Sequence, residues 1–134
     1  WAIRSVDKLN AYVKNHGPFK GILGYSQGAM FATYYLTQVP LGTFDFAVLF
    51  CGYLPITHLG LMETINEHKM KNTFSLNTLV YSGKLDTIIS NELTDELALL
   101  FNNPTKVRSP NLGHTLPLLF SSEYNTIIEF ILAQ

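Results

Sequence analysis

The sequence is poor in charged residues and contains a single cysteine. Of its 134 residues 14% are charged, against about 25% in an average globular domain. Because Cys51 has no partner, a disulfide scaffold is excluded. Nine basic and ten acidic residues give a net charge of -1, without the basic excess typical of nucleic-acid binding. No apolar run reaches the roughly 18 residues of a membrane-spanning helix, and a hydrophobic content of 47% excludes intrinsic disorder.

The beginning of the sequence lacks both an initiator methionine and a secretory signal. Trp1 is not followed by a basic segment and an apolar core, which a signal peptide would show. This start predicts a fragment, a processed form or a trimmed chain. The single unpaired cysteine predicts a reducing, cytoplasmic location.

Strand-like and helix-like segments alternate along the whole chain. Residues 44–51 (FDFAVLFC) are continuously apolar, as in a strand buried on both faces of a parallel sheet. Residues 26–38 are apolar nearly all round, which indicates a buried helix. The pattern predicts strands at 19–25, 44–51, 77–82 and 105–108, helices at 2–15, 26–38 and 90–101, a loop with a short helix in 53–73, and a last helix that begins at Pro117 or Ser121. This order predicts one α/β domain, with a mostly parallel sheet and helices on both faces.

The sharpest motif is Gly24-Tyr25-Ser26-Gln27-Gly28, which fits G-x-S-x-G. It follows a predicted strand and begins a predicted helix, which is the setting of a nucleophile elbow. We expect Gly24 and Gly28 to let the strand and helix approach closely around a strained Ser26 backbone. Ser26 would then lie at a helix N-terminus, with the backbone N–H of Gln27 as an oxyanion donor. The alternative is a glycine-rich turn without chemistry.

A serine nucleophile needs a base, and in this order of elements the base is a histidine on a late loop. Of the four histidines, only His114 follows a plausible acid at the end of a late strand. His16 precedes a helix-ending Gly-Pro pair, and His58 and His68 match no metal-binding spacing. We therefore choose His114 as the base and expect no metal site.

Four aspartates compete to be the acid that orients this histidine. Asp7 and Asp95 lie on predicted helices, and Asp45 begins a predicted strand. Asp86 comes directly after the third predicted strand, and open α/β sheets place functional groups at this end of their strands. We choose Asp86; the alternative is a turn residue that caps the helix starting near Ser90.

Four segments of the sequence, in order, are GPFKGILGYSQGAM, FDFAVLFCGY, VYSGKLDTIIS and NLGHTLP. They resemble the elbow, the next strand, the acid-bearing segment and the histidine loop of a fungal and animal serine hydrolase family. This family includes the yeast family of serine hydrolases and the human ovarian-cancer-associated protein 2. The sequence departs from the family pattern at Pro110 and Leu112, where the family tends to have a His and a double Gly. The resemblance implies the carboxyl-terminal portion, about four strands, of an α/β-hydrolase fold.

The resemblance also implies an activity, which is hydrolysis of carboxylic esters or thioesters through an acyl-enzyme, without a cofactor. Ser26 would attack the acyl carbonyl, His114 would take its proton, and Asp86 would orient the imidazole. The small or lipid-like ester substrates of the family imply an apolar acyl pocket, for which Met30, Tyr53 and Leu116 are the candidates.

Members of this family carry a further N-terminal part, which includes a His-Gly loop that supplies a second oxyanion donor. The resemblance therefore implies that the domain 1–134 is incomplete at its N-terminus. The strand at 19–25 would then be an exposed apolar edge through which chains could associate. Two alternatives stay open: an acyl-protein thioesterase-like carboxylesterase, whose family shares a GFSQG elbow, and an inactive or non-catalytic fragment of a hydrolase.

Overall fold

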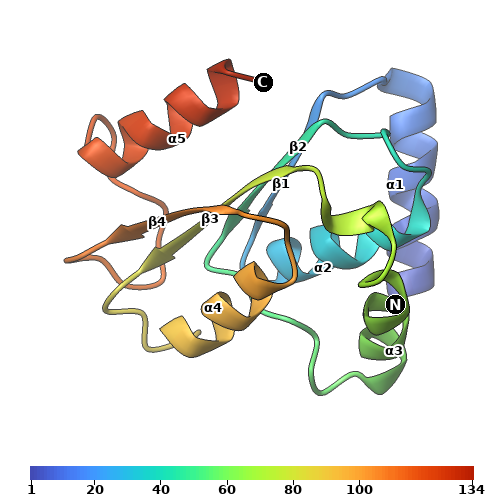
Figure 1. The fold of residues 1–134 in the computed structure, drawn as a ribbon, viewed down its shortest axis with the longest axis horizontal. Helices are drawn as coiled ribbons and strands as arrows, with labels where there is room; N and C mark the ends of the chain where they lie inside the picture. Colours follow the sequence, from blue (N-terminus) through green and yellow to red (C-terminus); the bar gives the residue numbers. More distant parts are fainter.

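The computed structural model describes residues 1–134 and contains one sheet of four strands flanked by helices (Figure 1). The elements in chain order are α1 (Ala2–His16), β1 (Gly21–Tyr25), α2 (Gln27–Tyr35), η1 (Leu36–Gln38), β2 (Phe46–Phe50), α3 (Leu59–His68), η2 (Asn72–Phe74), β3 (Asn77–Gly83), α4 (Asn91–Leu99), β4 (Thr105–Ser109) and α5 (Ser122–Leu132). The four predicted strands and the alternation of strands with helices are confirmed.

The structure defines where two of the predicted helices begin. The loop and short helix predicted in 53–73 are confirmed: α3 follows a loop, and the Nδ1 atom of His58 caps it by accepting the N–H of Leu61 at 3.3 Å. Of the two predicted starts of the last helix, Pro117 is wrong. Ser121 is the cap, because its Oγ accepts the N–H of Tyr124 at 3.2 Å and satisfies a helix-end donor.

All strands of the sheet are parallel and lie in the order β1-β2-β3-β4. The register pairs Tyr25 with Phe50, Phe50 with Tyr81, and Tyr81 with Val107, so the strands end side by side. The loops that follow the strands therefore gather at one edge of the sheet, where open α/β sheets hold functional groups. The predicted nucleophile Ser26, acid Asp86 and base His114 all lie in the segments that follow these strand ends.

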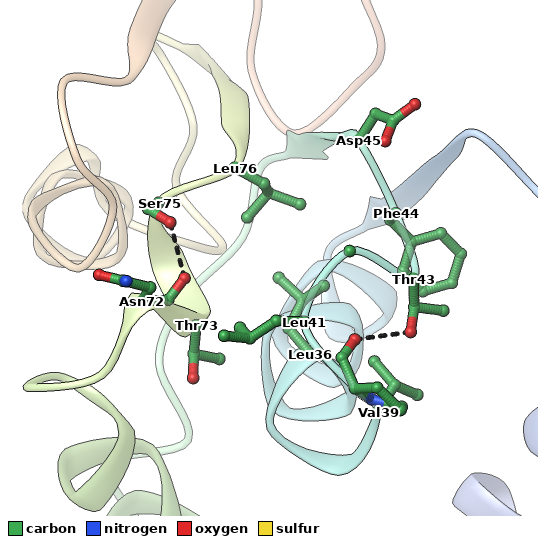
Figure 2. Close-up of a pocket in the computed structure, with 12 residues that line it drawn as sticks. Leu36, Val39, Leu41, Thr43, Phe44, Asp45, Asn72, Thr73, Ser75 and Leu76 are labelled. Atoms are coloured by element: carbon green, nitrogen blue, oxygen red, sulfur yellow. Dashed lines mark hydrogen bonds between the residues drawn. The ribbon is translucent and has the colours of Figure 1, made fainter.

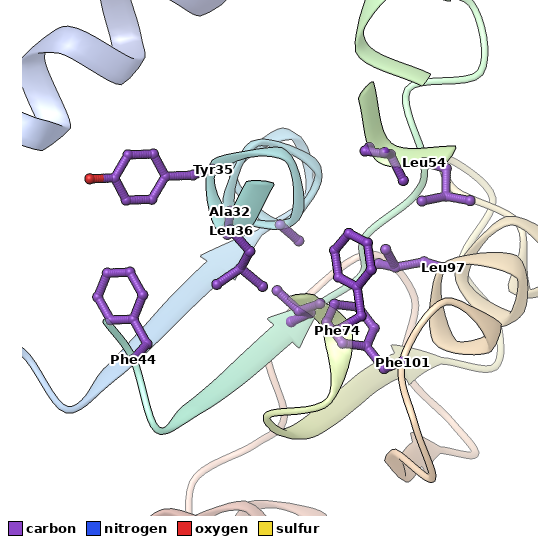
Figure 3. Close-up of a cluster of buried hydrophobic side chains, with 11 residues drawn as sticks. Ala32, Tyr35, Leu36, Phe44, Leu54, Phe74, Leu97 and Phe101 are labelled. Atoms are coloured by element: carbon purple, nitrogen blue, oxygen red, sulfur yellow. The ribbon is translucent and has the colours of Figure 1, made fainter. Parts of the chain in front are cut away.

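One face of the sheet packs against α2 and α4, while α3 packs against α2 and α1 lies at the side of this layer. The core on this face is shown in Figure 3 and consists of Ala29, Ala32, Tyr35, Leu36, Phe44, Leu49, Leu54, Ile65, Phe74, Leu97 and Phe101. Phe74 and Phe101 meet edge to face with ring centroids 5.4 Å apart. Since α2 contributes Ala29, Ala32 and Tyr35, it is the buried helix that its sequence predicts.

The other face of the sheet is covered by α5. Ile127 of α5 packs against Val48 and Tyr81 of the central strands. Because Val48 belongs to this core and Leu49 to the opposite one, β2 is buried on both sides. Figure 1 shows α5 on one side of the sheet and α2 with α4 on the other, so the predicted helices on both faces are confirmed. None of the helices has the length and hydropathy that crossing a bilayer requires.

Strand β1 is an edge of the sheet. Leu23 is 53% exposed, and a hollow of about 610 Å³ between α1 and β1 is lined largely by apolar side chains, among them Tyr12, Leu23 and Phe31. The exposed apolar edge that the sequence predicts is therefore present, whereas association of chains through it stays a prediction.

The turn from β1 to α2 requires a glycine at position 24. A Cβ on Gly24 would lie 2.7 Å from the Cα of Ala29, which is closer than side-chain contacts allow. A Cβ on Gly28 would meet nothing within 4 Å, because Gly28 borders the hollow beside β1. The strand thus meets the helix backbone at Gly28 and Ala29, as expected; the lack of a side chain is required at Gly24, whereas a Cβ at Gly28 would have room.

We predict that Gly24→Ala lowers the melting temperature by roughly 5–10 °C, because the added methyl group overpacks the strand–helix turn. Gly28→Ala is the matched control and should leave the melting temperature unchanged or slightly higher, since Ala favours a helix over Gly. Thermal unfolding followed by circular dichroism compares the two. Equal melting temperatures would contradict this account of the turn.

Candidate active site

Ser26 lies between β1 and α2 and has an unusual backbone. Its φ is 56° and its ψ is -117°, a conformation that costs about 1–3 kcal/mol for a residue with a side chain. The Ser26 N–H donates to the Phe50 carbonyl at 2.8 Å, and the Ser26 carbonyl accepts the N–H groups of Ala29 and Met30 at 3.0 and 3.2 Å. These bonds hold the strained turn in the strand–turn–helix setting of a nucleophile elbow.

His114 comes from the loop between β4 and α5, which leads back along the sheet edge to Ser26. Its Nε2 lies 2.9 Å from Ser26 Oγ. The loop passes against the end of β3, because the Leu85 N–H donates to the Leu112 carbonyl at 2.9 Å. A Cβ on Gly83 would lie 2.5 Å from the same carbonyl oxygen, so β3 and the loop touch through their backbones.

Asp86 directly follows β3, and its side chain is only 1% exposed. The Oδ2 atom lies 2.7 Å from His114 Nδ1, and Oδ1 accepts the N–H groups of Ile88 and Ile89, both at 2.9 Å. The alternative that Asp86 caps the following helix is wrong, because the side chain of Ser90 caps α4.

Ser26, His114 and Asp86 form one hydrogen-bonded chain with a defined direction. An ionised carboxylate only accepts hydrogen bonds, so we assign the imidazole N–H to Nδ1, which faces Asp86 Oδ2. With this assignment Nε2 is the acceptor of the Ser26 hydroxyl hydrogen. In this tautomer the imidazole is able to take a proton from a serine.

Cys51 is buried beside this chain, at the end of β2. Its thiol donates to the Thr115 carbonyl across 3.6 Å. Burial, and next the negative charge of Asp86, raise the pKa of Cys51 to about 11. The ligand atoms of Cys51, Asp86 and His114 lie within 4.8 Å of one another. We assign them to hydrogen bonding rather than to a metal, because Asp86 and His114 are bonded to each other and the Cys51 thiol is bonded to the Thr115 carbonyl.

The remaining predicted site residues are not part of this chain. Gln27 is the first residue of α2, where a backbone N–H has no acceptor inside the helix, and its oxyanion role stays a prediction. Met30 is 4% exposed and lies in a small buried cluster that Tyr53 also contacts. Leu116 is 53% exposed. The acyl pocket assigned to these three apolar residues stays a prediction.

Tyr25 is a neighbour of the site that the sequence pattern did not single out. Its hydroxyl donates to the His114 carbonyl at 2.7 Å, and its ring lies 5.2 Å from the imidazole, centroid to centroid. The signal in the sequence was its place inside the elbow motif, directly before Ser26.

A cavity of about 300 Å³ lies at the opposite edge of the sheet, where β2 and β3 begin (Figure 2). Its hydroxyl groups are engaged locally: Thr43 donates to the Pro40 carbonyl and Ser75 to the Asn72 carbonyl. Thr73, which also lines the cavity, bonds through Oγ1 to His68 Nδ1 at 2.9 Å. Asp45 is the one ionisable lining residue, and the hydrogen bonds of this cavity include no carboxylate on that histidine, in contrast to the bond between Asp86 and His114.

The parallel sheet and the elbow at its carboxyl edge define an α/β-hydrolase fold. The structure is similar to that of acyl-protein thioesterase 2 from Zea mays, with a TM-score of 0.68 and 23% identity over 97% of this chain and 64% of that one. It is also similar to SOBER1 from Arabidopsis thaliana, with a TM-score of 0.75 and 18% identity over 98% and 63% of the two chains. At sequence identities of 23% and 18%, this similarity establishes a shared fold and nothing more.

The chain belongs to the serine hydrolase (FSH1) family, whose sequence profile matches residues 3–124. It is 32% identical to an esterase of Drosophila melanogaster over an alignment of 126 residues, and this alignment covers 87% of this chain and 40% of the esterase. It is 30% identical over 105 residues to an esterase of Xenopus tropicalis, with coverages of 75% and 43%. The chain thus spans less than half the length of these two relatives. The family resemblance of the four sequence segments is confirmed.

We predict that Gly83→Ala displaces the loop that carries His114, because the new methyl group would overlap the carbonyl groups of Leu112 and Gly113. The imidazole resonances of His114 should shift in NMR spectra, and stability should fall by about 1–3 kcal/mol. Gly60→Ala is the control, since a Cβ there has its nearest neighbour at 3.8 Å. Unshifted His114 resonances in Gly83→Ala would show that the close approach is not needed.

We also predict that stability falls as the pH rises from about 9 to about 11. The unfolded thiol of Cys51 ionises near its ordinary pKa of 9.0, whereas the folded thiol keeps its proton up to about pH 11. The unfolded state therefore binds fewer protons in this interval, and the free energy of unfolding decreases with pH. Urea titrations across the interval should show that Cys51→Ala removes this part of the pH dependence; an unaltered slope in the variant would refute it.

Proposed function

We propose that this chain carries the nucleophile, base and acid of a hydrolase that cleaves carboxylic esters or thioesters. The observation that supports this most directly is the hydrogen-bonded chain from Ser26 Oγ through both nitrogens of His114 to Asp86 Oδ2. In this chain of hydrogen bonds His114 Nε2 faces the Ser26 hydroxyl and is placed to remove its proton. Ser26 itself lies in a nucleophile elbow between β1 and α2. Membership of a serine hydrolase family supports the same chemistry.

The reaction follows from the positions of these atoms. Ser26 Oγ attacks the acyl carbonyl while its proton moves to His114 Nε2, and the buried Asp86 carboxylate stabilises the imidazolium. The N–H of Gln27, at the N-terminus of α2, donates to the developing oxyanion. His114 then returns the proton to the leaving alcohol or thiol, which leaves an acyl-Ser26. Water attacks this ester while His114 takes its proton; the bond between the acyl carbon and Ser26 Oγ then breaks, His114 returns the proton to Ser26 Oγ, and the carboxylic acid departs.

The proposed substrates are small or lipid-like esters and thioesters. The relatives from Drosophila melanogaster and Xenopus tropicalis are named esterases, which favours esters. The profile match favours the serine hydrolase (FSH1) family over an acyl-protein thioesterase, since the Zea mays thioesterase shares the fold at 23% identity. Met30, Tyr53 and Leu116 remain the proposed acyl-binding residues, and the cytoplasm remains the proposed location.

We predict that a fluorophosphonate probe labels the chain and that Ser26→Ala abolishes the labelling. Asp86→Asn should lower the labelling rate on the order of 10⁴-fold, because it holds the imidazole in the wrong tautomer. Labelling is measured by intact-protein mass spectrometry over time.

The matched controls are Ser75→Ala and Asp45→Asn, which lie at the opposite edge of the sheet and should label at the unaltered rate. Labelling that survives Ser26→Ala would exclude Ser26 as the nucleophile. A folded chain that is never labelled would favour the alternative of a non-catalytic hydrolase fragment.

A further inference from the structure

Two side chains outside the hydrogen-bonded chain hold the backbone of the histidine loop. The Tyr25 hydroxyl donates to the His114 carbonyl at 2.7 Å, and the Cys51 thiol donates to the next carbonyl, that of Thr115, at 3.6 Å. Tyr25 ends β1 and Cys51 directly follows β2, so the two donors stand at the ends of neighbouring strands. Consecutive peptide groups of the loop are thereby tied to the edge of the sheet.

The loop has few other attachments around His114. Apart from the two bonds of the imidazole itself, residues 113–120 make only these two hydrogen bonds to other segments. The remaining bonds of this stretch are local, such as that from the Thr115 N–H to the Gly113 carbonyl at 3.0 Å. The position of the imidazole therefore depends on these two bonds, together with the Leu85–Leu112 bond that holds the chain just before His114.

Tyr25 is the stronger tether, because it contacts both the backbone and the ring of His114. Its ring lies tilted at 42° to the imidazole, with centroids 5.2 Å apart. A bond of 2.7 Å between a hydroxyl and a carbonyl is of ordinary strength, whereas a thiol donates weakly. Tyr25 also directly precedes Ser26, so its bond links the residue beside the nucleophile to the base itself.

The Tyr25 hydroxyl stays protonated and so remains able to donate to the His114 carbonyl. Desolvation raises the pKa of Tyr25 above its ordinary value of 10.0, and so do the charge that Cys51 acquires once its thiol ionises and the charge of Asp86. The hydroxyl therefore keeps its proton throughout the range in which a histidine acts as a base.

We infer that Tyr25 is a positioning residue, whose hydroxyl keeps the His114 imidazole within reach of both Ser26 and Asp86. This inference rests on the proposed function, in which His114 is the base. Tyr25 does not bond to Ser26 Oγ or to the imidazole nitrogens, so it acts through the loop and not on the reacting atoms. Loss of its hydroxyl leaves the ring in place but lets the imidazole leave the reactive geometry more often.

The test compares Tyr25→Phe with Tyr35→Phe in the full chain. Tyr35→Phe is the matched control, because it also removes one tyrosine hydrogen bond, of 2.6 Å to Asn10 Oδ1, but away from the sheet edge. In Tyr25→Phe the maximal rate of Ser26 labelling by the fluorophosphonate should fall about fivefold, the effect of one net hydrogen bond. The half-saturating probe concentration and the final labelled fraction should not change. Tyr35→Phe should keep the wild-type rate.

An unaltered labelling rate in Tyr25→Phe would overturn the inference. So would a smaller labelled fraction with an unaltered rate per labelled molecule, because that result indicates a role in folding alone. The Nδ1–H resonance of His114 gives a readout that needs no reactivity: it should broaden by exchange with water in Tyr25→Phe and stay sharp in Tyr35→Phe. If the chain is not labelled at all, the proposed function fails, while a sharp, unshifted resonance in Tyr25→Phe would still overturn the positioning role by itself.

Discussion

The strained backbone of Ser26 is the constraint on which the rest of the site depends. A φ of 56° at a residue with a side chain costs about 1–3 kcal/mol, and it persists only where the surroundings leave no alternative. Those surroundings are the crossing of β1 and α2 at Gly24 and the burial of α2 behind it. Tyr35 and Ala29 of this helix are fully buried, and a large apolar side chain contributes about 1.5–3 kcal/mol on burial. The packing of the helix therefore offsets the strain of the turn that precedes it.

The burial of the sheet on both faces also explains why the sequence has few charged residues and why its one buried charge, that of Asp86, needs several hydrogen bonds. Strand β2 is covered on both faces, which leaves no room for ionised side chains on it. Asp86, which follows β3, is the one acidic or basic residue that is buried, and a carboxylate in such surroundings is tolerable only when its oxygens are fully bonded. Two backbone N–H groups and the imidazole of His114 provide those bonds. The same surroundings keep Cys51 a neutral thiol, so a single negative charge faces the imidazole.

The sequence predicts the strands, the elbow and the order of the three site residues because each has a local pattern. A continuous apolar run marks β2, and two glycines around Ser26 mark the turn. Helix α3 was less visible because its cap is His58 rather than one of the usual short polar residues. The bond from Tyr25 to His114 was invisible, since it joins residues 89 positions apart and periodicity describes only near neighbours. The open space at Gly28 likewise depends on what lies beside the chain in three dimensions.

The order of the strands sets a condition on the geometry of the site. Ser26 follows β1, whereas His114 follows β4, so the histidine loop must reach past the ends of β3 and β2. Neighbouring strands lie about 4.8 Å apart, which makes this reach about 14 Å. A slight change in twist or spacing anywhere in the sheet alters the separation of the two side chains, and a hydrogen bond tolerates only a few tenths of an ångström. Active-site titration of Ser26 would consequently serve as a folding assay that detects native sheet geometry, which helix content alone does not report.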